Sequence, residues 1–84
     1  MDFQDQVVLI TGGSKGIGKA MAGAFARKGA LVIINYGHDE GAARKAEGEI
    51  QQAGGKVQTR QADITRSEEV NSMFKEILDR FHRL

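Results

Sequence analysis

The sequence has 84 residues, a formal net charge of +1 and no cysteine. This length fits one small domain, and so balanced a charge gives no general attraction to nucleic acid or to membranes. The lack of cysteine excludes disulfides and thiolate metal sites. No apolar run is long enough to cross a membrane and no secretion signal opens the chain, so we expect a cytoplasmic protein.

A short apolar strand and a glycine-rich turn open the chain. Residues 5–10 are expected to form a strand, because the run from Val7 to Ile10 is apolar and partly β-branched. A helix is expected over residues 16–28. Its apolar side chains recur at helical spacing and are predicted to face the sheet as one stripe, formed by Ile17, Ala20, Met21, Ala24 and Phe25.

Strands and helices are expected to alternate through the rest of the chain. The predicted elements are strands over residues 31–34 and 56–62, and helices over residues 41–53 and from a capping box at Thr65 and Glu68 to Phe81. This β-α-β-α-β-α order, joined by right-handed crossovers, predicts a three-layer α/β fold that is half of a Rossmann fold. Its parallel strands would run in the order 3-2-1, with the third strand at an edge. The first two helices would cover one face of the sheet and the third helix the other.

The glycine turn after the first strand is a candidate phosphate site. A helix N-terminus offers unpaired N–H groups and a positive partial charge, and glycines let a phosphate approach the backbone closely. The P-loop pattern fails because Ala20 stands where a magnesium-binding Ser or Thr is required, and the strict G-x-G-x-x-G pattern fails after Gly18. The pattern that fits is T-G-x-x-x-G-x-G, formed by Thr11, Gly12, Gly16 and Gly18. A plain strand-to-helix turn without a ligand is the alternative.

At these residues the sequence resembles the short-chain dehydrogenase/reductase family, and within it the 3-oxoacyl-[acyl-carrier-protein] reductase type. The resemblance implies a nicotinamide cofactor. Asn35 and Tyr36 stand where NAD-binding members keep an acid, and Lys15 stands where NADP-preferring members carry a base, so NADP is expected rather than NAD. Asp63 would meet the adenine amino group. The cofactor-binding residues that the resemblance implies are Thr11, Gly12, Ser14, Lys15, Gly16, Ile17, Gly18, Asn35, Tyr36, Asp63 and Ile64.

The residues that carry out the family's chemistry are missing from this chain. Family members reduce a carbonyl with a Tyr-x-x-x-Lys pair and a serine, whereas the one tyrosine here, Tyr36, is followed four residues later by Glu40. No catalytic residue is therefore assigned, and His38 and His82 stand too far apart in sequence for a local metal pair. We expect residues 1–84 to form a single N-terminal mononucleotide-binding half of a Rossmann domain, truncated before its fourth strand.

Two functions of different classes follow from this sequence. The first is the NADP(H)-binding half of an oxidoreductase whose parent reduces a carbonyl, such as a 3-oxoacyl thioester, and which is inactive alone. The alternative is a structural, self-assembling Rossmann fragment whose nucleotide turn is unoccupied. A missing fourth strand would leave the first strand open at its edge. We therefore expect a homo-oligomer, built through this edge or by exchange of the third helix.

Overall fold

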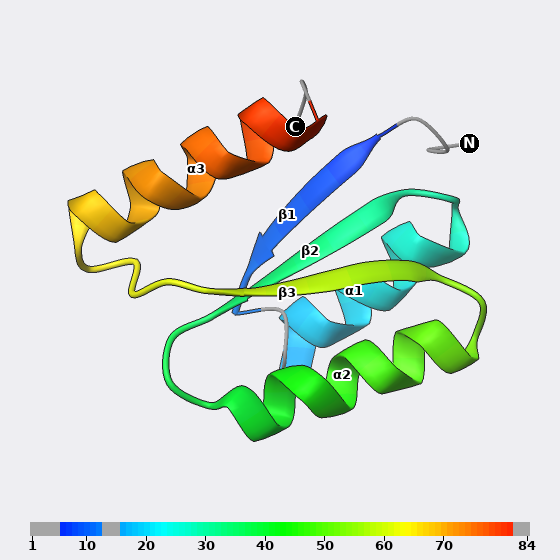
Figure 1. Cartoon of the computed structure of the whole chain (residues 1–84). Helices are drawn as coiled ribbons and strands as arrows, with labels where there is room; N and C mark the ends of the chain where they lie inside the picture. The colour runs from blue at the N-terminus through cyan, green and yellow to red at the C-terminus, as the bar shows by residue number, and fades with distance from the viewer. Residues whose placement is uncertain (1–5, 13–15, 82–84) are drawn as a thin grey trace.

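Three parallel strands and three helices alternate along the chain (Figure 1), and the computed structural model describes residues 6–12 and 16–81. The elements are β1 (Val7–Thr11), α1 (Gly16–Arg27), β2 (Leu31–Tyr36), α2 (Glu40–Gln52), β3 (Lys56–Gln61) and α3 (Ser67–Phe81). The strands lie in the order β1-β2-β3, with Val8 beside Val32 and Val32 beside Val57. The predicted α/β half-Rossmann fold is therefore confirmed, with β3 at an edge of the sheet.

The sheet lies between two helical layers, each with its own core. In Figure 1, α1 and α2 lie below the sheet and α3 lies above it, as predicted. The central strand β2 is buried on both faces because its side chains alternate: Val32 and Ile34 point to α1 and α2, and Ile33 points to α3. The core under α1 and α2 consists of Ile10, Ala22, Ala26, Ala30, Val32, Ile34, Ala46, Ile50 and Val57. The core under α3 consists of Val7, Ile33, Ala62, Met73 and Ile77.

The prediction of which face of α1 is buried against the sheet is wrong. The buried side chains of α1 are Ala22 and Ala26, with Phe25 partly buried beside them, whereas Ile17 is 80% exposed and Met21 is 46% exposed. Two faces of this helix carry apolar residues at helical spacing, and the face with the smaller side chains lets the helix lie close to the sheet. Of the predicted stripe, the exposed members are Ile17, Ala20, Met21 and Ala24.

The start of α3 differs from the predicted capping box. The helix begins at Ser67, and Thr65 donates its backbone N–H and its hydroxyl to Oδ1 of Asp63, at 2.9 and 2.6 Å. Glu69, rather than Glu68, reaches back, and its Oε1 accepts the backbone N–H of Asp63 at 2.9 Å. The turn before α3 is therefore organised by Asp63, since an aspartate side chain that accepts hydrogen bonds from the residue two places on stabilises a turn.

The turn between α2 and β3 packs tightly against both α1 and α2 at Gly55. A Cβ at this position would lie 2.7 Å from Cγ2 of Ile50 and 2.9 Å from Cβ of Ala26. We expect Gly55→Ala to lower the free energy of unfolding by roughly 1–3 kcal/mol, because an extra methyl group overpacks this contact. Gly48→Ala, in α2, is the control: no described atom lies within 4 Å of its Cβ position, and helix propensity should add about 0.5–1 kcal/mol. Urea unfolding of both variants checks this; a loss of similar size in both would contradict it.

Candidate functional site

The carboxyl ends of the three parallel strands meet at one edge of the sheet. Where β1 ends, the backbone N–H of Gly12 donates to the carbonyl of Asn35 at 3.0 Å. Where β3 ends, the N–H of Ala62 donates to the carbonyl of Tyr36 at 3.0 Å. These bonds align the loops that follow the strands, and in open α/β sheets ligands bind at this edge.

The two described ends of the turn from β1 to α1 adopt a backbone conformation that favours glycine. Gly12 and Gly16 adopt φ values of 67° and 56°, in the left-handed region that favours glycine. Among the described residues, no atom lies within 4 Å of the Cβ position of either glycine. Ser14 and Lys15, two of the predicted cofactor-binding residues, lie outside the described residues.

The other residues predicted from α1 and β1 lie around this turn. Gly18 is half-buried in the first turn of α1, Ile17 is exposed beside it, and Thr11 is exposed at the end of β1. The structure therefore brings the described members of the glycine pattern to one edge of the sheet, where a helix N-terminus also lies.

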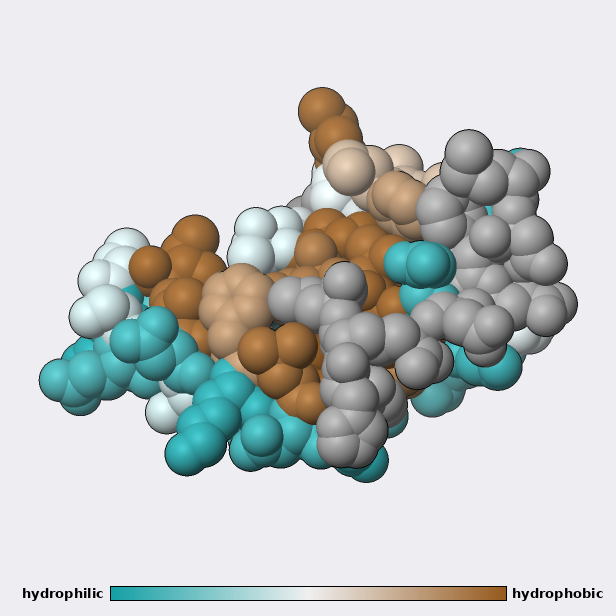
Figure 2. Space-filling model, turned by 90° about the horizontal axis from the view of Figure 1, so that it is seen from above, coloured by the Kyte–Doolittle hydropathy of each residue, from teal (hydrophilic) through white to brown (hydrophobic). Residues whose placement is uncertain are grey.

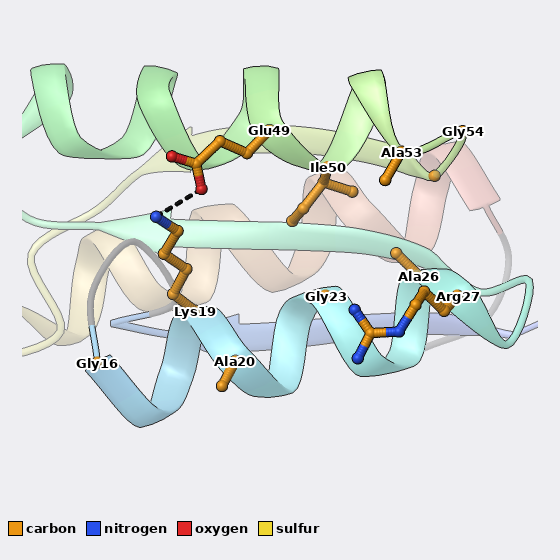
Figure 3. Close-up of a pocket in the computed structure, with 11 residues that line it drawn as sticks. Gly16, Lys19, Ala20, Gly23, Ala26, Arg27, Glu49, Ile50, Ala53 and Gly54 are labelled. Carbon is orange, nitrogen blue, oxygen red and sulfur yellow. Dashed lines mark ion pairs between the residues drawn. The ribbon is translucent and has the colours of Figure 1, made fainter.

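Lys19 is directed toward α2. Its Nζ lies 2.6 Å from Oε2 of Glu49, across the groove between α1 and α2 (Figure 3). In the P-loop pattern this lysine would contact the phosphates of a bound nucleotide. Its ion pair with Glu49, together with Ala20 in the place of a magnesium ligand, argues against a P-loop nucleotidase.

Asp63 lies at the carboxyl end of β3 with an ionised side chain. Its pKa lies below its ordinary value, chiefly because the hydroxyl of Thr65 donates to the carboxylate, and also through the Thr65 backbone N–H and the positive charges of His38 and Arg66. A lowered pKa means that the ionised carboxylate stabilises the folded chain. This stabilisation is fully present at a pH above the ordinary pKa of aspartate, and it is lost as the pH falls through the lowered pKa. A carboxylate offers about four lone-pair sites, so Asp63 can accept a further hydrogen bond from an amino group. Ile64, next to it, is 59% exposed.

Asn35 has a structural role that the sequence did not reveal. Its side chain is buried, and Nδ2 donates to the carbonyl of Ala62 at 3.1 Å and to that of Arg60 at 3.3 Å. The same nitrogen lies 3.6 Å from Sδ of Met73 in α3. The amide therefore holds the end of β3 beside β2 and points toward α3. Tyr36, which follows it, is also buried.

Two further contacts at this edge were missed by sequence reasoning. Nε2 of Gln61 donates to the carbonyl of Gly37 at 3.0 Å, which ties the end of β3 to the loop after β2. Asp39, at the end of the same loop, accepts the backbone N–H of Ala42 at 2.9 Å and caps α2. The only available signal was for Asp39, an aspartate just before a predicted helix, because such residues are favoured as N-caps.

Within residues 6–12 and 16–81, no three His, Cys, Asp or Glu side chains are grouped closely enough to hold a metal ion. Over the same residues, none of the helices has both the length and the apolar character needed to cross a bilayer. The cytoplasmic location expected from the sequence stays a prediction.

Comparison with known proteins identifies related sequences over almost the whole chain. The family model for short chain dehydrogenase matches residues 6–84. A 3-oxoacyl-[acyl-carrier-protein] reductase of Synechocystis is 42% identical over 79 residues, which are 94% of this chain and 32% of that protein. The 1-cyclohexenylcarbonyl-CoA reductase of Streptomyces collinus is also 42% identical, over 94% of this chain and 28% of its own length. This chain thus spans about a third of these relatives. The short-chain dehydrogenase/reductase homolog YusS of Bacillus subtilis is 35% identical over 94% of this chain, and the match covers 72% of YusS.

Solved structures give the same result for the fold. A metagenomic short-chain oxidoreductase in complex with NADP superposes with a TM-score of 0.92 at 31% identity, over 96% of this chain and 36% of that one. A citronellol catabolism dehydrogenase of Pseudomonas aeruginosa superposes with a TM-score of 0.90 at 32% identity, over 95% of this chain and 33% of that one. The three-stranded unit therefore corresponds to one part of larger Rossmann proteins.

The structural role of Asn35 gives a first prediction for the site. We expect Asn35→Leu to lower the free energy of unfolding by roughly 1–3 kcal/mol, because the carbonyl of Ala62 would lose its side-chain donor in a buried place. Asn71→Leu, on the exposed surface of α3, is the control and should have little effect. Chemical denaturation of both variants measures the difference; equal stability of Asn35→Leu and the parent chain would show that these hydrogen bonds do not hold β3.

Proposed function

Because the chain belongs to the short-chain dehydrogenase family, we propose that it binds NADP(H) as the nucleotide-binding, N-terminal half of a carbonyl-reducing oxidoreductase. The observation that carries this proposal is the left-handed pair Gly12 and Gly16, which opens α1 at the carboxyl edge of a parallel sheet. The N–H groups and the dipole of a helix N-terminus suit the negative charge of a pyrophosphate.

The preference for NADP rests on the charges around the turn. In this proposal Lys15 pairs with the 2′-phosphate, and β2 ends in the buried residues Asn35 and Tyr36 rather than in an acid. The first acid after β2 is Asp39, and its carboxylate is engaged as the N-cap of α2, where the helix dipole favours its charge. Neutral residues therefore stand at the end of β2, where NAD-binding members of the family keep an acid that would repel a 2′-phosphate.

The chemistry of the parent enzyme would require residues beyond this chain. The sequence lacks the Tyr-x-x-x-Lys pair, so we assign it cofactor binding without catalysis. The relative from Synechocystis is named as a 3-oxoacyl-[acyl-carrier-protein] reductase. We therefore assign a 3-oxoacyl thioester to the parent as its kind of carbonyl substrate.

A structural, self-assembling fragment is the second candidate function. It is favoured by the apolar side chains that α1 leaves exposed next to the glycine turn, where Ile17 is 80% exposed and Met21 is 46% exposed. The two residues stand four positions apart, so they are neighbours on the helix surface, and contiguous exposed apolar surface marks contact with other molecules.

Calorimetric titration of the chain with NADP and with NAD distinguishes the two functions. We expect saturable binding that favours NADP. Lys15→Ala should weaken NADP binding about tenfold and leave NAD binding unchanged, because only NADP carries the 2′-phosphate that accepts a charge-assisted hydrogen bond. Lys28→Ala, an exposed lysine beyond the other end of α1, is the control. Equal affinities for the two cofactors would contradict the NADP assignment, and no heat from a folded chain would favour the structural alternative.

The role of Asp63 can be tested with AMP and IMP, which differ by an amino group in place of a carbonyl on the base. An ionised carboxylate accepts a hydrogen bond from the amino group of AMP and repels the carbonyl of IMP, so AMP should bind about tenfold more tightly. Asp63→Asn should reduce this preference, because its amide can also donate to the carbonyl of IMP. Asp79→Asn, on the exposed surface of α3, should leave it unchanged. The same preference in Asp63→Asn as in the parent chain would exclude Asp63 from the adenine site.

A further inference from the structure

Side-chain amides tie the carboxyl ends of β2 and β3 together. The ladder between these strands ends where the N–H of Ala62 donates to the carbonyl of Tyr36. The buried amide of Asn35 donates to the carbonyl of Ala62 and holds the strands side by side. The exposed Gln61 reaches further, and its Nε2 donates to the carbonyl of Gly37 at 3.0 Å. This last bond is not needed for strand pairing, because it acts on the loop that follows β2.

The bond from Gln61 fixes the orientation of one peptide group. The carbonyl of Gly37 and the N–H of His38 belong to the same peptide, which is trans. In a trans peptide the C=O and the N–H point in opposite directions. Because Gln61 draws this carbonyl toward β3, the N–H of His38 points away from β3. Among the described residues, no group accepts a hydrogen bond from this N–H.

The remaining polar groups of the loop are engaged with α2. The carbonyl of His38 accepts the N–H of Glu40 at 3.1 Å. Oδ1 of Asp39 accepts the N–H of Ala42 at 2.9 Å, and Oε2 of Glu40 lies 3.4 Å from Nη2 of Arg44. Both acids beside His38 therefore have partners in α2, and the N–H of His38 is left as a donor to a ligand.

This loop lies where the proposed function places the ribose of the cofactor, at the end of β2. Asn35 and Tyr36 are 2% and 8% exposed, so their side chains are packed inside the protein. The first exposed residue after β2 is His38. In Figure 1 the loop after β2 leaves the sheet at the end where α3 begins, and Figure 2 shows hydrophilic side chains at this end, on the left. A 2′-phosphate would therefore meet the backbone of the loop rather than a side chain of β2.

We infer that Gln61 is a positioning residue of the cofactor site, an inference that rests on the proposed binding of NADP(H). Its bond to Gly37 orients the N–H of His38 so that this group donates to the 2′-phosphate. Hydrogen bonds to an ionised acceptor are stronger than those between neutral groups. In the proposed function Lys15 supplies positive charge through three rotatable donors, whereas the N–H of His38 supplies one donor in a fixed direction.

The glycine at the start of the loop makes this positioning necessary. Glycine loses more conformational freedom on ordering than any other residue, so an untethered Gly37 would let its peptide rotate. The parallel register places Gln61 beside Tyr36, which brings the Gln61 amide next to the loop. Because the peptide is already held, less conformational entropy is lost when the phosphate binds.

Calorimetric titration of the chain with adenosine 2′,5′-bisphosphate and with 5′-AMP tests the proposal, because these ligands differ by the 2′-phosphate alone. We expect the bisphosphate to bind more tightly. Gln61→Met keeps a side chain of similar length but has no N–H donor, and it should reduce this preference about threefold to tenfold. Gln58→Met, the same change on the opposite face of β3, is the control.

Each outcome of this titration supports or overturns a stated claim. An unchanged preference in Gln61→Met overturns the positioning role, and so does an equal loss in Gln58→Met. No preference in the unmutated chain would overturn the NADP assignment itself, and the role of Gln61 with it.

Nuclear magnetic resonance of the unmutated chain tests the donor directly. The amide proton of His38 should shift downfield when adenosine 2′,5′-bisphosphate is added, because it then donates to a phosphate oxygen. The same titration with 5′-AMP should not produce this shift. A His38 amide that does not respond, in a chain that still prefers the bisphosphate, would show that another group holds the 2′-phosphate. That result would overturn the role of Gln61 and leave the NADP assignment standing.

Discussion

Burial of β2 on both faces is the constraint on which the rest of the structure depends. Its four apolar residues alternate between two cores, so helices must cover both sides of the sheet. Right-handed crossovers then place α1 and α2 on one face and leave α3 to cover the other. The same parallel alignment gathers the carboxyl ends of all strands at one edge. The site is therefore a consequence of how β2 is buried.

The two helical layers are attached by different means. On the α1 and α2 face, small side chains such as Ala22, Ala26 and Ala46 allow close packing onto β2. On the other face α3 contributes Met73 and Ile77 to the core, and polar contacts from Asn35 and Arg60 supplement them. Burying the Asn35 amide costs little free energy of folding because its N–H donors are hydrogen-bonded. These bonds also fix the position of β3 beside β2.

Much of the fold was predictable from the sequence, because short segments determine where helices and strands begin and end. Apolar runs and the glycines that follow them are visible within a few residues, so the elements and their order could be predicted directly. The buried face of α1 could not be predicted, because which of its two apolar faces packs on the sheet depends on how closely the helix approaches the sheet. For the site, the glycine turn and Asp63 were found from the sequence. The structural roles of Asn35 and Lys19 were missed, since their partners are distant in the chain.

Hydrogen bonds at the end of β2 position the loops on both sides of it. The last bond between β1 and β2, from the N–H of Gly12 to the carbonyl of Asn35, sets where the glycine turn begins. The side-chain amide of the same Asn35 donates to the carbonyl of Ala62, just before Asp63. One buried residue therefore aligns the glycine turn with Asp63, although the two lie far apart in the sequence, because parallel strands end at the same edge of the sheet.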